Sequence, residues 1–197
     1  MAAPSDTMAD RLLEAFADSA ARLYGGEPVT ELAHSLQCAE LARDAGADEE
    51  LQLACLLHDV GRFAVDPRLI FDKKDRALGA RADARGHHEV GADLIAPYVP
   101  ERVAWLVRMH ADAKRYLCAV EPAYWDTLTP GSRYTLTLQG GVMTAEAVTG
   151  LTRHPWLAAA LQLRRWDDLA KVPDRPTRPL EAWAPLLRRH FTRPRDA

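Results

Sequence analysis

The chain has 197 residues and a formal net charge of −3, from 25 lysines and arginines against 28 aspartates and glutamates. Both signs are mixed along the sequence, which argues against a dedicated nucleic-acid binder or membrane-surface protein. The length suffices for one well-buried core, so we expect a single domain over residues 1–197, with a proline-rich tail at 173–197.

The three cysteines, Cys38, Cys55 and Cys118, are an odd number and lie in apolar stretches rather than in a paired spacing such as CxxC. This usage is typical of reduced thiols in the cytoplasm. No apolar run approaches the roughly 18 residues that a membrane helix needs, and the first residues lack a cationic region followed by an apolar one. We therefore expect a soluble, cytoplasmic protein without a membrane partner, and the sequence leaves its oligomeric state open.

Helical periodicity dominates the chain, because apolar residues recur three and four apart and no β-branched run alternates with polar residues. The expected fold class is all-α. Glycine pairs and capping residues give the boundaries: Gly25-Gly26 stops the first helix, and Thr30 and Asp48 suit the N-caps of the next two. Helices are expected at residues 8–23, 30–45, 49–60, 87–97, 100–117, 132–138 and 155–171, with an amphipathic segment at 180–191 that packs on the surface.

Residues 62–86 form a polar, charged stretch that is too long for a simple connector between helices. Connections in compact domains are usually short, and longer ones tend to be functional loops. We interpret this segment as a lid or an irregular insertion.

The adjacent pair His58-Asp59 ends the apolar segment LQLACLLHDVG. Ala54 and Leu57 share a helical face with His58, so its imidazole is expected to point into the core, and Asp59 brings a carboxylate to the same helix end. Burying both groups costs free energy unless they are compensated. A metal ion compensates both by taking them as ligands. A dipeptide of this kind also occurs by chance, so the pair alone does not identify a metal site.

Three further histidines lie on separate predicted helices. His34 shares a helical stripe with Leu41 on the helix expected at 30–45. His87 opens the helix expected at 87–97, and His110 completes an apolar stripe on the helix expected at 100–117. For each histidine alone, a core side chain bonded to a carbonyl is the simpler interpretation. Four inward imidazoles together with Asp59 favour a metal site.

The segment RRWDD supplies one more carboxylate, from Asp167 or Asp168, and helical spacing from Arg164 does not choose between them. Four imidazoles and two carboxylates suit two first-row transition metals better than one magnesium ion, which prefers oxygen ligands. Asp59 can bridge such a pair. Two bridged metals either activate water for hydrolysis or, if they are redox-active, bind dioxygen.

The sequence segments around these residues are more specific than the pattern of ligands alone. They resemble the HD-domain oxygenases of the PhnZ and TmpB type, over about residues 24–172. This branch of the HD superfamily uses a mixed-valent Fe(II)/Fe(III) pair and dioxygen to cleave the carbon-phosphorus bond of an α-hydroxyphosphonate, giving a carboxylic acid and phosphate. The similar segments are YGGE (24–27), ELAHSLQCA (31–39), LLHDVG (56–61), HHEVGAD (87–93), HADAKRYL (110–117), TLTLQGG (135–141) and RRWDD (164–168).

The resemblance implies a complete ligand set for two iron ions, with dioxygen as co-substrate and Asp59 as the bridging ligand. It selects His87 over His88, because the following VGAD anchors the alignment, and Asp167 over Asp168. The implied ligands are His34, His58, Asp59, His87, His110 and Asp167.

Two cations, Lys114 and Arg164, lie one helical turn from implied metal ligands on their own helices. Such cations would neutralise a phosphonate dianion through charge-assisted hydrogen bonds. The resemblance adds Ser132 and Gln139 as polar contacts of the phosphonate, for which a helix cap or a surface polar group is the alternative interpretation.

Tyr24 and Glu27 are the most diagnostic residues outside the metal shell. The resemblance implies that Tyr24 occupies an iron position until substrate displaces it, and that Glu27 lies near an amino or trimethylammonio group at C2 of the substrate. Charge complementarity favours a cation there. Two positions depart from the family pattern: Arg62 replaces a usual histidine and is expected to contact substrate, and Ala33 replaces a usual glutamate.

Two other functions fit an HD-type ligand set. A metal-dependent phosphohydrolase acting on a nucleotide or phosphomonoester would use the same six ligands, with a metal-bound hydroxide as nucleophile. A non-catalytic HD module would instead sense a ligand or bind a partner. Tyr24 and Glu27 favour the oxygenase over the hydrolase, and the full ligand set argues against the non-catalytic module.

Overall fold

The structure is a computed structural model of the chain and describes residues 7–63 and 86–191. Within these two ranges the secondary structure is helical and contains no strand, apart from one isolated β-bridge between Leu23 and Thr30. The expected all-α fold is confirmed. The α-helices are α1 (Met8–Asp18), α2 (Glu31–Asp44), α3 (Glu49–Leu57), α6 (His87–Ile95), α7 (Glu101–Val120), α8 (Tyr124–Thr127), α9 (Pro130–Leu138), α10 (Ala145–Leu151), α11 (Leu157–Leu169) and α12 (Ala184–His190).

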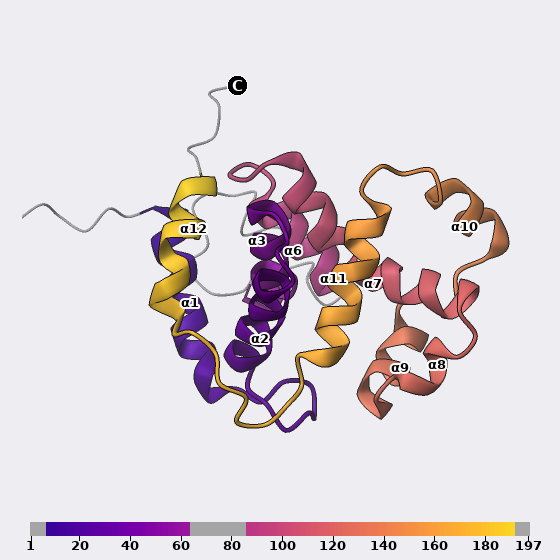
Figure 1. Cartoon of the computed structure of the whole chain (residues 1–197), viewed down its shortest axis with the longest axis horizontal. Coiled ribbons are helices and arrows are strands. Elements are labelled where there is room, and N and C mark those ends of the chain that lie inside the picture. Colours follow the sequence, from indigo (N-terminus) through magenta and orange to yellow (C-terminus); the bar gives the residue numbers. More distant parts are fainter. Residues whose placement is uncertain (1–6, 64–85, 192–197) are drawn as a thin grey trace, which may run out of the picture.

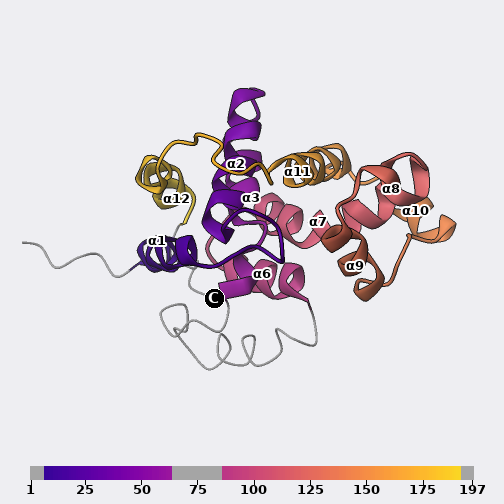
Figure 2. The same cartoon turned by 90° about the horizontal axis from the view of Figure 1, so that it is seen from below.

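Four helices form the centre of the molecule. Helices α2, α3, α7 and α11 pack on one another, and α6 packs on α7. In Figure 1, α1 and α12 lie side by side at one end of this centre, and α8, α9 and α10 extend from the other end. Figure 2 shows the same separation from below. The central helices are therefore the ones that can direct side chains from several parts of the sequence toward one point.

Side-chain caps fix the starts of the helices that matter most for the site. The Thr30 hydroxyl accepts a hydrogen bond from the Ala33 N–H at the start of α2, and the Asp48 carboxylate accepts one from the Leu51 N–H at the start of α3. Both agree with the predicted caps, and each such cap typically contributes about 1 kcal/mol. Gly46, with φ of 71°, ends α2 in the left-handed conformation, as expected.

The first helix is shorter than predicted. It ends at Asp18, and a 3-10 turn, η1 (Ser19–Ala21), follows in place of the expected helix to residue 23. The hydroxyl of buried Ser19 donates to the Phe16 carbonyl at 2.7 Å, a local bond that competes with helix propagation. Leu23 then pairs with Thr30 across a turn, which brings Tyr24 toward α2.

The third helix was also predicted too long. Helix α3 ends at Leu57, and His58 and Asp59 lie in a turn before the 3-10 helix η2 (Val60–Phe63). Leaving the helix at this point lets two adjacent side chains address one site, which a continuing helix would rotate apart by about 100°.

The turn after Asp59 packs directly on the start of α6. A Cβ at Gly61 would lie 1.8 Å from the His87 carbonyl oxygen and 2.7 Å from the Gly91 nitrogen, so only glycine fits. This close backbone approach fixes the position of His87 relative to Asp59.

The C-terminal segment was predicted to pack on the surface, and this was wrong. A 3-10 helix, η4 (Leu180–Trp183), and α12 contribute Trp183 and Leu187 to the main hydrophobic core, where both are almost fully buried. Helix α12 packs against α1 and α3. Prolines and arginines in and around this segment hid its role, although Leu180, Trp183, Leu186 and Leu187 all belong to the core.

Two short helices, α8 and α10, were not predicted, and α9 begins at Pro130 rather than at residue 132, with Thr129 as its N-cap. The expected lid at 62–86 lies outside the described residues except for Arg62, Phe63 and Gly86. No helix in the described ranges is both long and apolar enough to span a bilayer.

Candidate metal centre

Five helical segments bring the six predicted ligand side chains together. They come from the first turn of α2, the turn after α3, the first residue of α6, the middle of α7 and the end of α11. The side chains are His34, His58, Asp59, His87, His110 and Asp167, and all but His87, whose side chain is 23% exposed, are buried.

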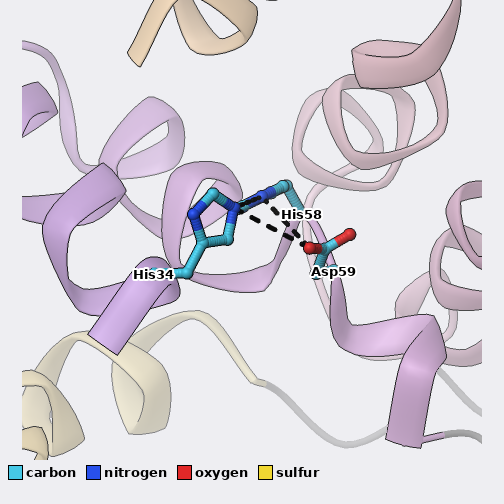
Figure 3. A group of neighbouring side chains, drawn as sticks. All are labelled: His34, His58 and Asp59. Carbon is cyan, nitrogen blue, oxygen red and sulfur yellow. Dashed lines mark hydrogen bonds and ion pairs between the residues drawn. The ribbon is translucent and has the colours of Figure 1, made fainter. Parts of the chain in front are cut away.

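His34 and His58 form the first half of the cluster. Their Nε2 atoms lie 3.0 Å apart, while His34 Nδ1 lies 2.8 Å from the Ala170 carbonyl and His58 Nδ1 lies 2.7 Å from the Cys55 carbonyl. Because each Nδ1 donates to a carbonyl, each Nε2 presents a lone pair to the other. Figure 3 shows Asp59 beside this pair, with its Oδ2 3.8 Å from His34 Nε2 and 3.6 Å from His58 Nε2. Only a cation between these atoms, a proton or a metal ion, makes the arrangement favourable.

His87 and His110 form the second half. Their Nε2 atoms are 3.2 Å apart, and His110 Nδ1 lies 2.7 Å from the Val107 carbonyl. Asp59 Oδ1 lies 2.9 Å from His87 Nε2 and 3.8 Å from His110 Nε2. Asp59 therefore directs one oxygen at each half, and it belongs to both groups of candidate metal donors, each with its donor atoms within 4.8 Å of one another.

The carboxylates of the cluster are incompletely satisfied. Among the described residues, both oxygens of Asp59 and Oδ1 of Asp167 are buried without a hydrogen-bond partner in suitable geometry. Asp167 Oδ1 lies 3.3 Å from His34 Nε2, and its Oδ2 accepts from Arg164 at 2.5 Å. Buried acceptors of this kind are costly, and nitrogen and carboxylate oxygen donors at this spacing suit a transition-metal ion. The residues present therefore fit the implied pair of metal ions.

The rival residues, His88 and Asp168, make different contacts from the predicted ligands. The His88 ring lies edge-on to the His110 ring, with centroids 5.9 Å apart. His88, next to His87, has its pKa lowered to about 4 by burial and by the neighbouring His87, so it stays neutral at physiological pH. Asp168 accepts hydrogen bonds from Arg164 and from the Tyr124 hydroxyl instead of facing the histidines.

Electrostatics holds the acids of the cluster ionised. Burial raises the pKa of Asp59, but the charges of Arg62 and the nearby histidines outweigh it and keep that pKa well below its usual range. Burial lowers the pKa of His58, but Asp59 and other neighbours raise it to about 10. Burial and the cationic neighbours keep the pKa of His110 well below its usual range. Asp59 and Asp167 therefore stay ionised, and their carboxylates attract a cation to the space between the histidines.

A cavity of about 50 Å³ opens beside the cluster. It is lined by the histidines of the second half and by all seven predicted substrate contacts. These are Tyr24, Glu27, Arg62, Lys114, Ser132, Gln139 and Arg164. Burial and the Arg164 charge lower the pKa of Lys114 to about 7, while its ammonium donates to the Ser132 carbonyl at 3.2 Å and to Thr135 Oγ1 at 2.8 Å.

The loop residues lie at the cluster side of the cavity. The Tyr24 ring stacks on the His34 ring with centroids 3.9 Å apart. The Arg62 guanidinium lies over the Tyr24 ring, 4.9 Å from its centroid. Arg62 Nε is also 3.2 Å from Asp59 Oδ2. Glu27 Oε1 accepts a hydrogen bond from the Thr129 hydroxyl at 2.6 Å, which fixes its carboxylate at the cavity wall.

Four lining residues were not among the predicted site residues: Gly25, Gly131, Thr135 and Lys171. Thr135 lies three positions after Ser132 on α9, a spacing that would have found it once Ser132 was chosen. Lys171 follows the end of α11, where no helical spacing applies, so the sequence held no clear signal for it.

The sequence profile of the HD domain matches residues 32–170. The chain is 37% identical over 166 residues to the [1-hydroxy-2-(trimethylamino)ethyl]phosphonate dioxygenase (glycine-betaine-forming) of Leisingera caerulea, covering 84% of this chain and 81% of the relative. It is 38% identical over 161 residues to the hydroxymethylphosphonate dioxygenase of Gimesia maris, covering 82% and 77%. The chain belongs to the HD-domain family. Within it, the resemblance to the hydroxyphosphonate dioxygenases is confirmed.

Proposed function

We propose that the six clustered side chains hold two iron ions, with Asp59 as the bridging ligand. The shared carboxylate, its unsatisfied oxygens and the two facing pairs of imidazoles support this assignment. Mixed-valent iron would supply the redox chemistry by which dioxygen is used as oxidant. The dioxygenase names of the relatives support a redox-active metal, and the choice of iron rests on the resemblance to the HD-domain oxygenases.

The proposed reaction is the oxidative cleavage of the carbon-phosphorus bond of an α-hydroxyphosphonate. One dioxygen is consumed, the C1–H and C1–P bonds break, and new C–O and P–O bonds give a carboxylate, phosphate and a proton. The observation that carries the proposal is that a cavity with a cationic wall opens directly onto a bimetallic donor cluster in a chain related to two hydroxyphosphonate dioxygenases.

The side chains around the cavity would orient the substrate. Lys114 and Arg164 would face the phosphonate oxygens, and Ser132 and Gln139 would add hydrogen bonds. The amide oxygen of Gln139, an acceptor, is buried without a hydrogen-bond partner among the described residues, so it can accept from an O–H or N–H of a ligand, while only its NH2 group could donate to a phosphonate oxygen. A cavity of about 50 Å³ holds only a few waters, so a substrate needs Tyr24 to move off His34 before it can bind.

Glu27 would select a substrate with a cation at C2, such as an amine or a trimethylammonium group. One of its oxygens is engaged by Thr129, which leaves the carboxylate charge fixed at the cavity wall. The substrates named for the two relatives differ at C2. One is [1-hydroxy-2-(trimethylamino)ethyl]phosphonate, with a trimethylamino group at C2, and the other is hydroxymethylphosphonate, which has no C2.

The HD-type phosphohydrolase is the second candidate, because the same donor cluster can activate water. It predicts turnover without dioxygen and with a redox-inert metal. We also propose the cytoplasm as the location, on the basis of three free cysteines.

One experiment separates the two functions. Iron-loaded protein, purified without air, is incubated with 2-amino-, 2-trimethylammonio- and unsubstituted α-hydroxyphosphonates, and phosphate release is measured with and without dioxygen. The oxygenase releases phosphate only with dioxygen and consumes one dioxygen per phosphate. Equal release without dioxygen contradicts it, and phosphate release from a phosphomonoester, tested alongside with and without dioxygen, supports the hydrolase.

Glu27→Gln then tests substrate selection. The variant should lose activity toward the two cationic substrates by about tenfold or more, which corresponds to the loss of one partly desolvated charge pair. Hydroxymethylphosphonate has no C2 group and serves as the matched control substrate. If its turnover falls by the same factor, Glu27 does not select the C2 cation.

A further inference from the structure

Two residues that follow α11, Ala170 and Val172, bond to side chains of α2. The Ala170 carbonyl accepts from His34 Nδ1 at 2.8 Å. The Val172 N–H donates to Gln37 Oε1 at 3.1 Å, and the Val172 carbonyl accepts from Gln37 Nε2 at 2.8 Å. Gln37 is 1% exposed, so its amide is committed to this backbone at both ends. Lys171, between these two anchors, therefore has its backbone held from both sides.

The Lys171 side chain extends from this anchored backbone to the cavity, and it is only 7% exposed. Its ammonium donates to Ser132 Oγ at 2.9 Å and lies 3.6 Å from Asp168 Oδ1, too far for a hydrogen bond. An ammonium carries three donors. In the described part of the chain, Ser132 is its one hydrogen-bond acceptor, which leaves donors for a ligand in the cavity.

Ser132 lies between two ammonium groups. Its carbonyl accepts from Lys114 at 3.2 Å, and its hydroxyl oxygen accepts from Lys171 at 2.9 Å. Because the hydroxyl oxygen accepts from Lys171, its own hydrogen points away from that ammonium and is available to a ligand oxygen. Ser132 is in the first turn of α9, where the helix dipole also favours an anion.

Arg164 alone cannot supply the charge that a dianion needs. Its guanidinium donates to Asp167 Oδ2 at 2.5 Å and also to both oxygens of Asp168, so much of its positive charge is balanced by two carboxylates. Lys114 and Lys171 add two ammonium groups on this side of the cavity, and Lys171 shares Asp168 with Arg164 at 3.6 Å. Two ammonium groups match the two negative charges of a phosphonate.

We propose that Lys171 is a binding residue for the tetrahedral anionic group of the substrate, acting with Lys114 on either side of Ser132. This rests on the proposed function for the identity of the anion as a phosphonate. In the complex, Lys171 donates one hydrogen bond to an anion oxygen while it keeps its bond to Ser132. The Gln37–Val172 contact holds the ammonium at the cavity wall.

The test measures binding of inorganic phosphate, the tetrahedral product, to iron-loaded protein by calorimetry without dioxygen or turnover. Lys171→Met removes the charge and keeps the length, and should weaken phosphate binding by about tenfold or more, the usual effect of losing a hydrogen bond to a charged group. Arg165→Met is the matched control. It removes one charge from α11 at a position outside the cavity lining, where Arg165 pairs with Glu121 and both side chains are exposed.

Lys171→Arg keeps the charge, so its dissociation constant for phosphate should stay within about threefold of wild type. Lys171→Met should lose more affinity, because it removes a charge-assisted hydrogen bond. The proposal is overturned if Lys171→Met weakens phosphate binding no more than Arg165→Met does, or if Lys171→Arg loses as much as a neutral side chain. Should Lys171→Met not fold, the arginine variant still decides. Phosphate binding requires no turnover. The binding result can therefore be interpreted even if the oxygenase assay shows no activity.

Discussion

His34 and His58 face each other through their Nε2 atoms at 3.0 Å, and each ring has its Nδ1 on a backbone carbonyl. This geometry fixes the tautomer of both rings and aims two lone pairs at one point. In a buried site such an arrangement is unfavourable unless a cation lies between the rings. The backbone of Ala170 and Cys55 thus prepares the two side chains as ligands before any ion arrives.

His58→Ala should lose bound iron and activity together, because it removes one of the donors at the most buried position of the cluster. Metal analysis of protein purified without air should find about half the wild-type iron content or less. The control is His190→Ala, which removes a histidine that pairs with Glu49 away from the cluster. Full iron content in the His58→Ala protein would contradict the ligand assignment.

Lys114→Met should keep the iron and weaken substrate binding. Its ammonium contacts Ser132 and Thr135 rather than the candidate ligands, so its loss leaves the donors in place. We expect KM for the phosphonate to rise about tenfold or more, with iron content unchanged, since a charge-assisted hydrogen bond is lost. Steady-state kinetics and metal analysis on the same sample check this. An unchanged KM would remove Lys114 from the phosphonate site.

Substrate affinity should depend on pH through Lys114. Burial and Arg164 lower its pKa to about 7, so the free protein loses this charge as the pH rises through neutrality. A bound dianion raises that pKa again, so binding takes up a proton above pH 7, and KM should rise by up to about tenfold per pH unit there.

Lys114→Arg provides the comparison, because an arginine keeps its charge over this range. Ionisation of the phosphonate itself affects both proteins equally. The ratio of wild-type to Lys114→Arg KM should therefore stay constant below about pH 7 and rise above it. A ratio that does not change with pH would show that Lys114 does not titrate in binding.

Gly61→Ala should destabilise the protein and reduce iron retention. The new Cβ would lie 1.8 Å from the His87 carbonyl oxygen, so η2 and α6 must move apart, and overpacking of this kind typically costs about 1–3 kcal/mol or more. Gly150→Ala is the control, because a Cβ there meets nothing within 4 Å and alanine favours the helix. Thermal unfolding should show a lower midpoint for the first variant and an equal or higher one for the second. Equal midpoints for Gly61→Ala and wild type would show that the contact can relax.

Sequence patterns were enough for the main helices, and the family resemblance was needed to choose among the candidate ligands. His34 and His110 lie on periodic helices whose inward faces are marked by apolar neighbours, while His58 and Asp59 lie in the turn after α3. The patterns failed where structure depends on contacts remote in sequence. The burial of Trp183 depends on packing of the C-terminal segment with the rest of the core, and the place of Lys171 depends on Gln37, more than 130 residues earlier.

The fit between Gly61 and the start of α6 has a consequence for the metal pair itself. Main-chain contact between Gly61 and α6 fixes how far the Asp59 turn lies from His87. Substitution of other side chains cannot adjust this distance in small steps. Ions of different radius must then be accommodated by rotation of the Asp59 carboxylate, within a backbone frame that stays constant. Discrimination among metals would accordingly originate in the rigidity of a glycine turn as well as in the chemistry of the ligands.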